Sequence, residues 1–69
     1  MKDKYRYIHF IQLEQSFWMC RNTKHDSTLG FVEYCPQWKR FVFLPESNTQ
    51  FSIECMIDII DFIKQLKTE

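Results

Sequence analysis

The chain has 69 residues, with nine Lys and Arg against nine Asp and Glu, so its formal net charge is zero. This length fits one domain spanning 1–69, and a neutral chain has no overall attraction to nucleic acid or to a membrane surface. The charges are unevenly spread. Residues 1–45 carry seven Lys or Arg against four Asp or Glu, whereas residues 46–69 carry two against five. This distribution predicts a weakly basic sheet followed by an acidic helix.

Aromatic residues are unusually frequent, because the chain has seven Phe, two Trp and three Tyr. A chain this short buries only about 60% of the surface that it exposes when unfolded, so its own core gives marginal stability. Each aromatic side chain can bury about 150–250 Å². We therefore expect part of the aromatic surface to be buried between subunits of a homo-oligomer.

The three cysteines, Cys20, Cys35 and Cys55, cannot all pair in disulfides, and no two have a C-x-x-C spacing. The first residues lack the apolar core of a signal peptide. No apolar run approaches the roughly 20 residues that span a bilayer. These features predict a cytoplasmic protein with free thiols and no membrane partner.

Four segments have the alternation and the β-branched and aromatic content of strands. Residues 22–28 are wholly polar and form the longest connection between them. Short connections favour an antiparallel meander. The predicted strands cover about residues 5–13, 16–21, 29–35 and 38–44, and Pro36 and Gln37 make the turn between the last two.

The C-terminal segment is predicted to be helical over about residues 53–67. Ser52 has the position of an N-cap, because its hydroxyl can accept from a free N–H of the first turn. Apolar residues recur at steps of three and four, with Ile57 and Phe62 at the edges of this stripe. The predicted core stripe consists of Met56, Ile59, Ile60, Ile63 and Leu66.

The resulting fold class is α+β, with a four-stranded antiparallel meander followed by one C-terminal helix packed on one face (ββββα). The hairpin between Leu29 and Pro45 has apolar residues on both faces, although a helix covers only one face. An apolar outer face usually has a further partner. Gly30 lies inside a strand, where it lets an aromatic side chain from a neighbouring strand lie over the backbone.

The sequence offers no recognised catalytic motif. His9 lies in a predicted strand and His25 in a polar loop, while Cys35 has no neighbouring base that would activate its thiol. A single glycine excludes a glycine-rich phosphate loop. The Cys and His spacings match no zinc signature. We therefore expect a protein that is not an enzyme and has no metal and no cofactor.

Aromatic and cationic residues form the remaining candidate site. Aromatic rings stack on bases and Lys or Arg neutralise phosphates, so this combination suits a nucleotide or a single strand. Alternatively, either tryptophan packs in the core or between subunits, and the cations are simply solvated. The candidate ligand-binding residues are Trp18, Arg21, Trp38, Lys39 and Arg40.

Several of these residues belong to a longer pattern, which runs through Leu29-Gly30, Val32, Tyr34, Trp38 to Pro45, Phe51-Ser52, Cys55 and the apolar helix positions 57–63. Over about residues 18–66 the chain resembles a set of small uncharacterised phage and prophage proteins. It departs from their pattern at Phe31 and Cys35, where a polar and an aromatic residue are expected. The strand order is also similar to that of single-strand DNA-binding transcriptional coactivators, a topological analogy only.

The resemblance implies a small phage-type protein that antagonises host defence in the host cytoplasm. Some such proteins sequester signalling nucleotides, and others block a nuclease by direct contact. Three functions therefore stay open: sequestration of a nucleotide-like ligand, inhibition of a host defence nuclease by protein–protein contact, and binding of single-stranded nucleic acid. Neutral net charge weakens the third, because such binders usually show a basic stripe.

Overall fold

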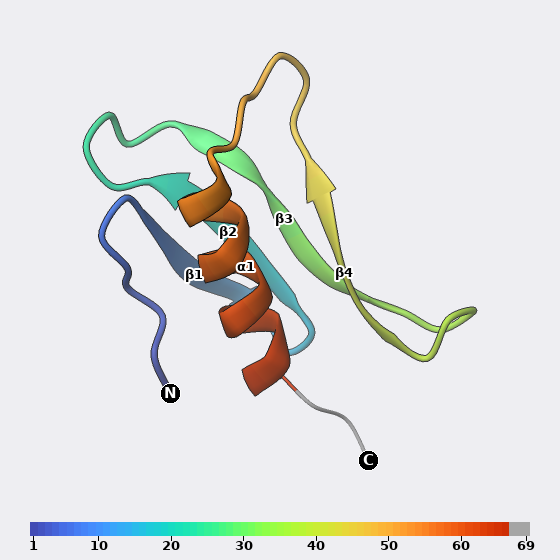
Figure 1. Ribbon diagram of the computed structural model, residues 1–69. Coiled ribbons are helices and arrows are strands. Elements are labelled where there is room, and N and C mark those ends of the chain that lie inside the picture. The colour runs from blue at the N-terminus through green and yellow to red at the C-terminus, as the bar shows by residue number, and fades with distance from the viewer. Residues whose placement is uncertain (67–69) are drawn as a thin grey trace.

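The computed structural model describes residues 1–66 and has four strands followed by one helix (Figure 1). The strands form one antiparallel sheet in the order β1-β2-β3-β4. The predicted ββββα arrangement is confirmed. The elements are β1 (Ile8–Glu14), β2 (Phe17–Asn22), β3 (Thr28–Cys35), β4 (Arg40–Pro45) and α1 (Ile53–Gln65).

The first strand begins at Ile8, and the prediction that it begins near Tyr5 is wrong. The chain turns sharply before β1, because the Tyr5 N–H donates to the Ile8 carbonyl at 2.8 Å. The Phe10 N–H donates to the Asp3 carbonyl, also at 2.8 Å, and Lys4 forms a bridge with His9. Residues 3–4 therefore run beside β1 and cover part of its outer edge.

The turn between β3 and β4 is longer than predicted. It occupies residues 36–39, and β4 begins only at Arg40. Lys39 has a φ of 55°, a left-handed conformation that a continuous strand does not contain. Trp38 and Lys39 therefore lie in the turn and not in the strand as predicted.

The core lies between α1 and one face of the sheet (Figure 1). Phe62 is fully buried at its centre, where its ring stacks on Phe10 with centroids 3.9 Å apart. The Trp18 ring meets Phe62 edge-on at 4.9 Å. The buried side chains are Ile8, Phe10, Trp18, Cys20, Val32, Ile59, Phe62 and Leu66.

The helix presents a different face to the sheet from the one predicted. Its most buried side chains are Ile59, Phe62 and Leu66, whereas Met56 and Ile60 are 46% and 54% exposed. Phe62 is the centre of the contact and not its edge, because its ring fills the space over Phe10 and Trp18. The helix is therefore rotated relative to the predicted stripe, which leaves several apolar residues facing outward.

Both ends of α1 are held by specific hydrogen bonds. The Ser52 hydroxyl accepts from the Cys55 N–H at 3.2 Å, which confirms the predicted N-cap. Near the other end, the Gln65 amide donates to the Lys2 carbonyl and accepts from the Lys2 N–H. The helix ends at Gln65, and residue 67 of the predicted helix lies outside the described residues.

Candidate functional site

The sheet face opposite α1, here called the open face, carries a continuous apolar row. The strand register sets Ile11 opposite Met19, Met19 opposite Phe31, and Phe31 opposite Leu44. The row therefore takes one side chain from each of the four strands. Phe17 adds to it, because its ring stacks on Phe31 with centroids 5.2 Å apart and planes 6° apart.

No element among residues 1–66 covers the open face, since α1 packs on the other side (Figure 1). The two ends of the row are exposed, with Ile11 at 39% and Leu44 at 43%. Met19 and Phe31 between them are half-buried, and Phe17 stacks on Phe31. A continuous apolar patch of this kind on a small protein typically marks an interaction site.

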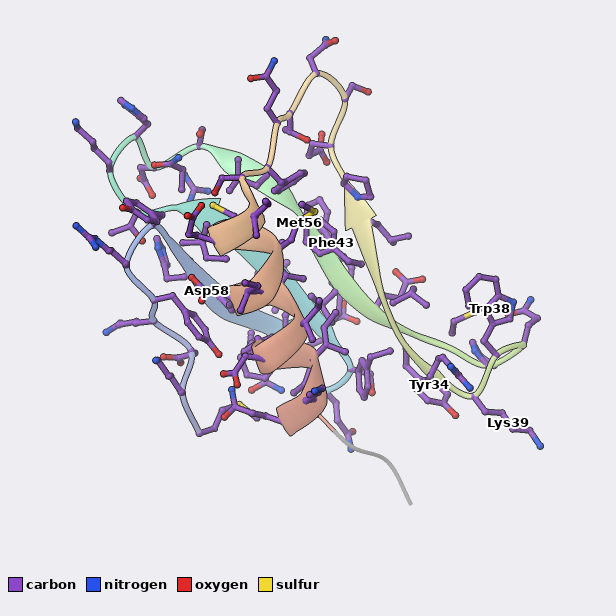
Figure 2. All side chains as sticks on the ribbon, in the orientation of Figure 1. Tyr34, Trp38, Lys39, Phe43, Met56 and Asp58 are labelled. Carbon is purple, nitrogen blue, oxygen red and sulfur yellow. The ribbon has the colours of Figure 1, made fainter. Side chains whose placement is uncertain are left out.

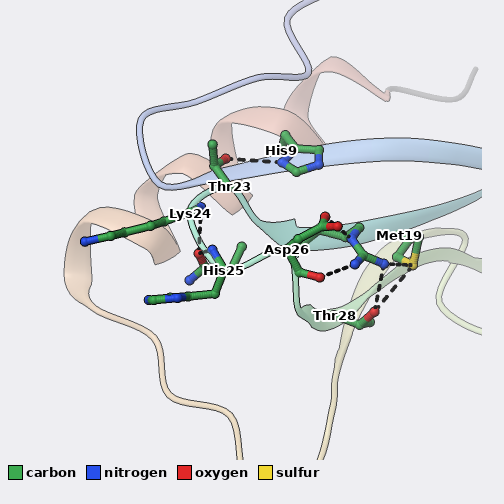
Figure 3. A network of polar contacts seen from close by, with 9 residues as sticks. His9, Met19, Thr23, Lys24, His25, Asp26 and Thr28 are labelled. Carbon is green, nitrogen blue, oxygen red and sulfur yellow. Dashed lines mark hydrogen bonds and ion pairs between the residues drawn. The ribbon is translucent and has the colours of Figure 1, made fainter.

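Arg21 lies at one end of the open face and is already engaged by neighbouring groups; Figure 3 labels its partners Met19, Asp26 and Thr28. Its Nε donates to Asp26 Oδ1 at 2.9 Å, and its Nη2 donates to the Asp26 carbonyl. Its Nη1 also lies 3.4 Å from Thr28 Oγ1 and 3.8 Å from Met19 Sδ. Arg21 therefore organises the β2–β3 loop, and its charge is largely compensated by Asp26.

The opposite end of the open face is acidic. Glu33 is exposed and pairs in register with Phe17 and Val42. A hollow at this end is lined by Glu14, Gln15, Ser16, Phe17, Glu33 and Tyr34. Its two carboxylates repel an anion such as a nucleotide phosphate.

The five predicted ligand-binding residues do not converge on one place. Trp18 lies in the core with 8% of its surface exposed, so its ring is not available for stacking on a base. Arg21 pairs with Thr28 at the beginning of β3, whereas Arg40 pairs with Cys35 at the end of that strand. These two positions are about 23 Å apart along β3. Only Trp38, Lys39 and Arg40 stay together.

Trp38 and Lys39 lie at the tip of the β3–β4 hairpin (Figure 2), and Arg40 follows them as the first residue of β4. Trp38 is 67% exposed, and its carbonyl accepts from Arg40 Nε at 3.3 Å. The Trp38 N–H donates to the Cys35 carbonyl at 3.2 Å, which closes the turn. Figure 2 shows the Trp38 and Lys39 side chains pointing in different directions from the tip. The tip is thus an exposed aromatic and cationic projection.

Two further surfaces were not identified from the sequence. An apolar stripe runs along the outer side of α1 and consists of Ile53, Met56, Ile57 and Ile60, which are 46–69% exposed. The signal for it is that the helix has more apolar residues than one buried stripe can hold. At the β2–β3 end of the sheet, a hollow is lined by Arg6, Tyr7, Asn22, Thr23, Lys24 and His25. Its signal is the basic charge of the first 45 residues.

The cysteines are free, and Cys20 is fully buried. Burial raises the pKa of the Cys20 thiol to about 12, with a smaller contribution from Cys55. This thiol therefore stays protonated and behaves as a small apolar side chain. Among residues 1–66, no group of three or more His, Cys, Asp or Glu side chains is arranged to hold a metal ion.

Comparison of the chain with protein-family models, with curated proteins and with solved structures found no match. Within the described part of the chain, no helix has the length and the apolar content needed to cross a membrane.

Proposed function

We propose that the protein is a non-catalytic binding protein whose open face docks on another protein. The observation that carries this proposal is the apolar row Ile11–Met19–Phe31–Leu44, which crosses all four strands and is covered by nothing in residues 1–66. Rigid strands hold the row in place, so binding costs little conformational entropy. Aromatic and Met side chains such as Phe31 and Met19 are also those enriched at interfaces.

The chemistry near the open face fits a protein partner better than a nucleotide. The Arg21 guanidinium beside Met19 is paired with Asp26, and at the far end Arg40 shares the face with the exposed carboxylate of Glu33. The patch therefore offers apolar contact with a charged rim of both signs, which resembles the organisation of protein interfaces. The resemblance to phage proteins points to a host defence nuclease in the host cytoplasm as the partner.

The experiment is a capture comparison from a lysate of the host cell with three immobilised baits: the natural chain, Phe31→Asp and Ile57→Asp. Both substitutions add one negative charge at an apolar site, but Phe31 lies on the open face and Ile57 on the outer side of α1. We expect one stoichiometric protein to be retained by the natural chain and by Ile57→Asp, and lost with Phe31→Asp.

Ile11→Asp provides a second open-face variant, because Ile11 is 39% exposed and its replacement leaves the core intact. Circular dichroism and thermal melting establish that each bait is folded. Equal retention by all folded baits, or no stoichiometric protein with the natural chain, contradicts the proposal.

A second candidate function is the binding of a nucleotide-like anion at the hairpin tip. The observation that favours it is the 67% exposed Trp38 ring beside Lys39 and Arg40, since a ring can stack on a base while the cations meet phosphates. Calorimetric titration with cyclic and linear nucleotides tests it. Heat that disappears in Trp38→Ala supports this candidate, and no heat with any nucleotide contradicts it.

Binding of single-stranded nucleic acid is the third candidate and the least supported. Trp18 is buried and Arg21 is paired with Asp26, so of the five predicted ligand-binding residues only the three at the tip are available to a strand. Counterion release predicts that such affinity falls steeply with salt. A titration with an oligonucleotide at two salt concentrations separates this candidate from the other two.

A further inference from the structure

The two edges of the sheet are treated differently by the fold. Beside β1, residues 3–4 form backbone hydrogen bonds and a bridge, so that edge is partly covered. On the other side, β4 is the last strand of the sheet, and no segment among residues 1–66 pairs with its outer edge. Figure 1 shows β4 at the free side of the sheet, beyond α1.

The outward backbone groups of β4 follow from its pairing with β3. The Glu46 N–H donates to the Leu29 carbonyl, so residues 46 and 29 form a hydrogen-bonded pair. Along an antiparallel ladder, hydrogen-bonded pairs alternate with pairs that are not hydrogen-bonded to one another. The backbone groups of residues 40, 42 and 44 therefore point toward β3. Phe41 and Phe43 direct their N–H and C=O groups outward. Pro45 also lies in the outward set, where its lack of an N–H does not disturb the β3–β4 ladder.

The apolar composition of β4 favours pairing of its outer edge with another strand. Between Arg40 and Pro45 the strand reads Phe-Val-Phe-Leu, with Phe41 and Phe43 on the helix side and Val42 and Leu44 on the open face. Apolar edge strands pair readily with other chains, and proteins that remain monomeric usually protect them with short strands, charge, Pro, bulges or cover. In β4 the Pro is the last residue, Pro45, so the four apolar residues between the ends of the strand have no such protection. Within β4 only Arg40 is charged.

The flank of α1 that faces the β4 side of the molecule is also exposed and apolar. Asp61 accepts a hydrogen bond from the Tyr5 hydroxyl at 2.8 Å, so this flank of α1 faces the N-terminal segment beside β1. Met56 lies about 140° around the helix from Asp61, on the flank directed away from that segment, and it is 46% exposed. The N-terminal segment therefore covers the β1 side of the molecule, whereas the β4 side exposes apolar side chains.

We propose that β4 pairs antiparallel with β4 of a second copy of this chain, across a two-fold axis near Phe43. Residues that pair across such an axis share a face of the sheet, so Phe43 lies opposite Phe43 of the second copy. Arg40 then lies opposite Glu46 of the second copy. The symmetry produces this Arg–Glu contact twice, and this charge complementarity selects a second copy as the occupant.

In this register the outward backbone N–H groups of β4 have carbonyl acceptors on the second copy. The Phe43 N–H groups donate to the Phe43 carbonyls of the opposite copy, and the Phe41 N–H groups donate to the Pro45 carbonyls. A chain with zero net charge also associates with itself without overall repulsion. The dimer has one continuous eight-stranded sheet, in which the two open faces lie side by side.

The first test measures the mass of the full chain by sedimentation equilibrium and the hydrogen exchange of individual amides by NMR. We expect a dimer, with Phe41 and Phe43 amides that become protected as the protein concentration rises. A chain that is still monomeric at about 1 mM, where even a millimolar dissociation constant would give dimer, or a dimer in which these two amides exchange freely, overturns the proposal.

The second test is a charge reversal on the exposed pair. Arg40→Glu and Glu46→Lys each replace attraction with repulsion at two symmetric contacts, and we expect each to raise the dimer dissociation constant about tenfold. The double variant restores the pair in the opposite sense and returns the constant close to its natural value. Lys24→Glu, with the same charge change as Arg40→Glu in a remote loop, leaves it unchanged. Equal weakening by Lys24→Glu, or no restoration in the double variant, contradicts this register. Neither substitution alters the open-face row, so the capture experiment stays independent of this one.

Discussion

The ring of Phe43 on β4 lies directly over Gly30 on β3. A β-carbon built on Gly30 meets Phe43 Cζ at 2.6 Å and the Leu44 carbonyl oxygen at 2.6 Å. Side chains never approach so closely, so only glycine fits at this position while β4 keeps its path. The sequence interpretation of Gly30, as a residue that lets an aromatic side chain pass over the backbone, is confirmed.

We predict that Gly30→Ala lowers the free energy of unfolding by about 1–3 kcal/mol, because the added methyl group forces β4 to shift. Chemical denaturation monitored by circular dichroism measures this loss. Truncating Phe43 in the same chain should not restore stability, since the Leu44 carbonyl belongs to the backbone and stays in place. Full restoration in Gly30→Ala/Phe43→Leu would show that the ring alone sets the limit.

The rotation of α1 gives a second prediction. Phe62→Ala should lower the free energy of unfolding by about 3–5 kcal/mol, because it empties the space between Phe10 and Trp18. Ile60→Ala should change it by no more than about 0.5 kcal/mol, since Ile60 is 54% exposed. Thermal or urea unfolding of the two variants compares them directly. Similar losses at both positions would mean that α1 presents the predicted stripe after all.

The strand order and the helix were predictable because alternation, polar loops and the Ser52 cap are local signals. The orientation of α1 was not, because Met56, Ile57, Ile60 and Phe62 are all apolar and periodicity cannot rank them. The large flat ring of Phe62 decides the matter only once Phe10 and Trp18 lie opposite it. Trp18 shows the same limit for the site. A tryptophan on a strand can pack in the core or stack on a ligand, and only the position of the helix shows which face of the sheet is the core.

Cys20 gives the protein a defined sensitivity to alkaline pH. Its pKa is raised from 9.0 to about 12 in the folded chain, so the folded state disfavours the thiolate. The stabilisation is fully present below pH 9 and is lost as the pH rises from about 9 to 12, with a slope of about 1.4 kcal/mol per pH unit. Denaturation of the natural chain and of Cys20→Ala across this range measures it, and the slope should be shallower in the variant.

The pKa of Tyr5 is raised by burial and by its hydrogen bond to Asp61, so it contributes in the same direction, from about pH 10 upward. Tyr5→Phe is the matched variant for this contribution. Identical alkaline slopes in the natural chain, Cys20→Ala and Tyr5→Phe would contradict both assignments.

The N-cap of α1 provides a further prediction. Ser52→Ala should lower the free energy of unfolding by about 1 kcal/mol, because the Cys55 N–H loses its acceptor. Ser47→Ala, in the connector before the helix, is the control and should leave stability unchanged. A loss at both positions would assign the effect to the connector as a whole.

The central claim is that the open face binds another protein. The most direct test is a calorimetric titration of the captured partner with the natural chain, Phe31→Ala and Ile57→Ala. Phe31 lies in the middle of the four-strand row, where an interface concentrates its binding energy. We predict that Phe31→Ala raises the dissociation constant about 30-fold or more, equivalent to about 2 kcal/mol, and that Ile57→Ala leaves it unchanged. A dissociation constant that is insensitive to Phe31 but raised by Ile57→Ala would place the binding surface on α1 and contradict the account.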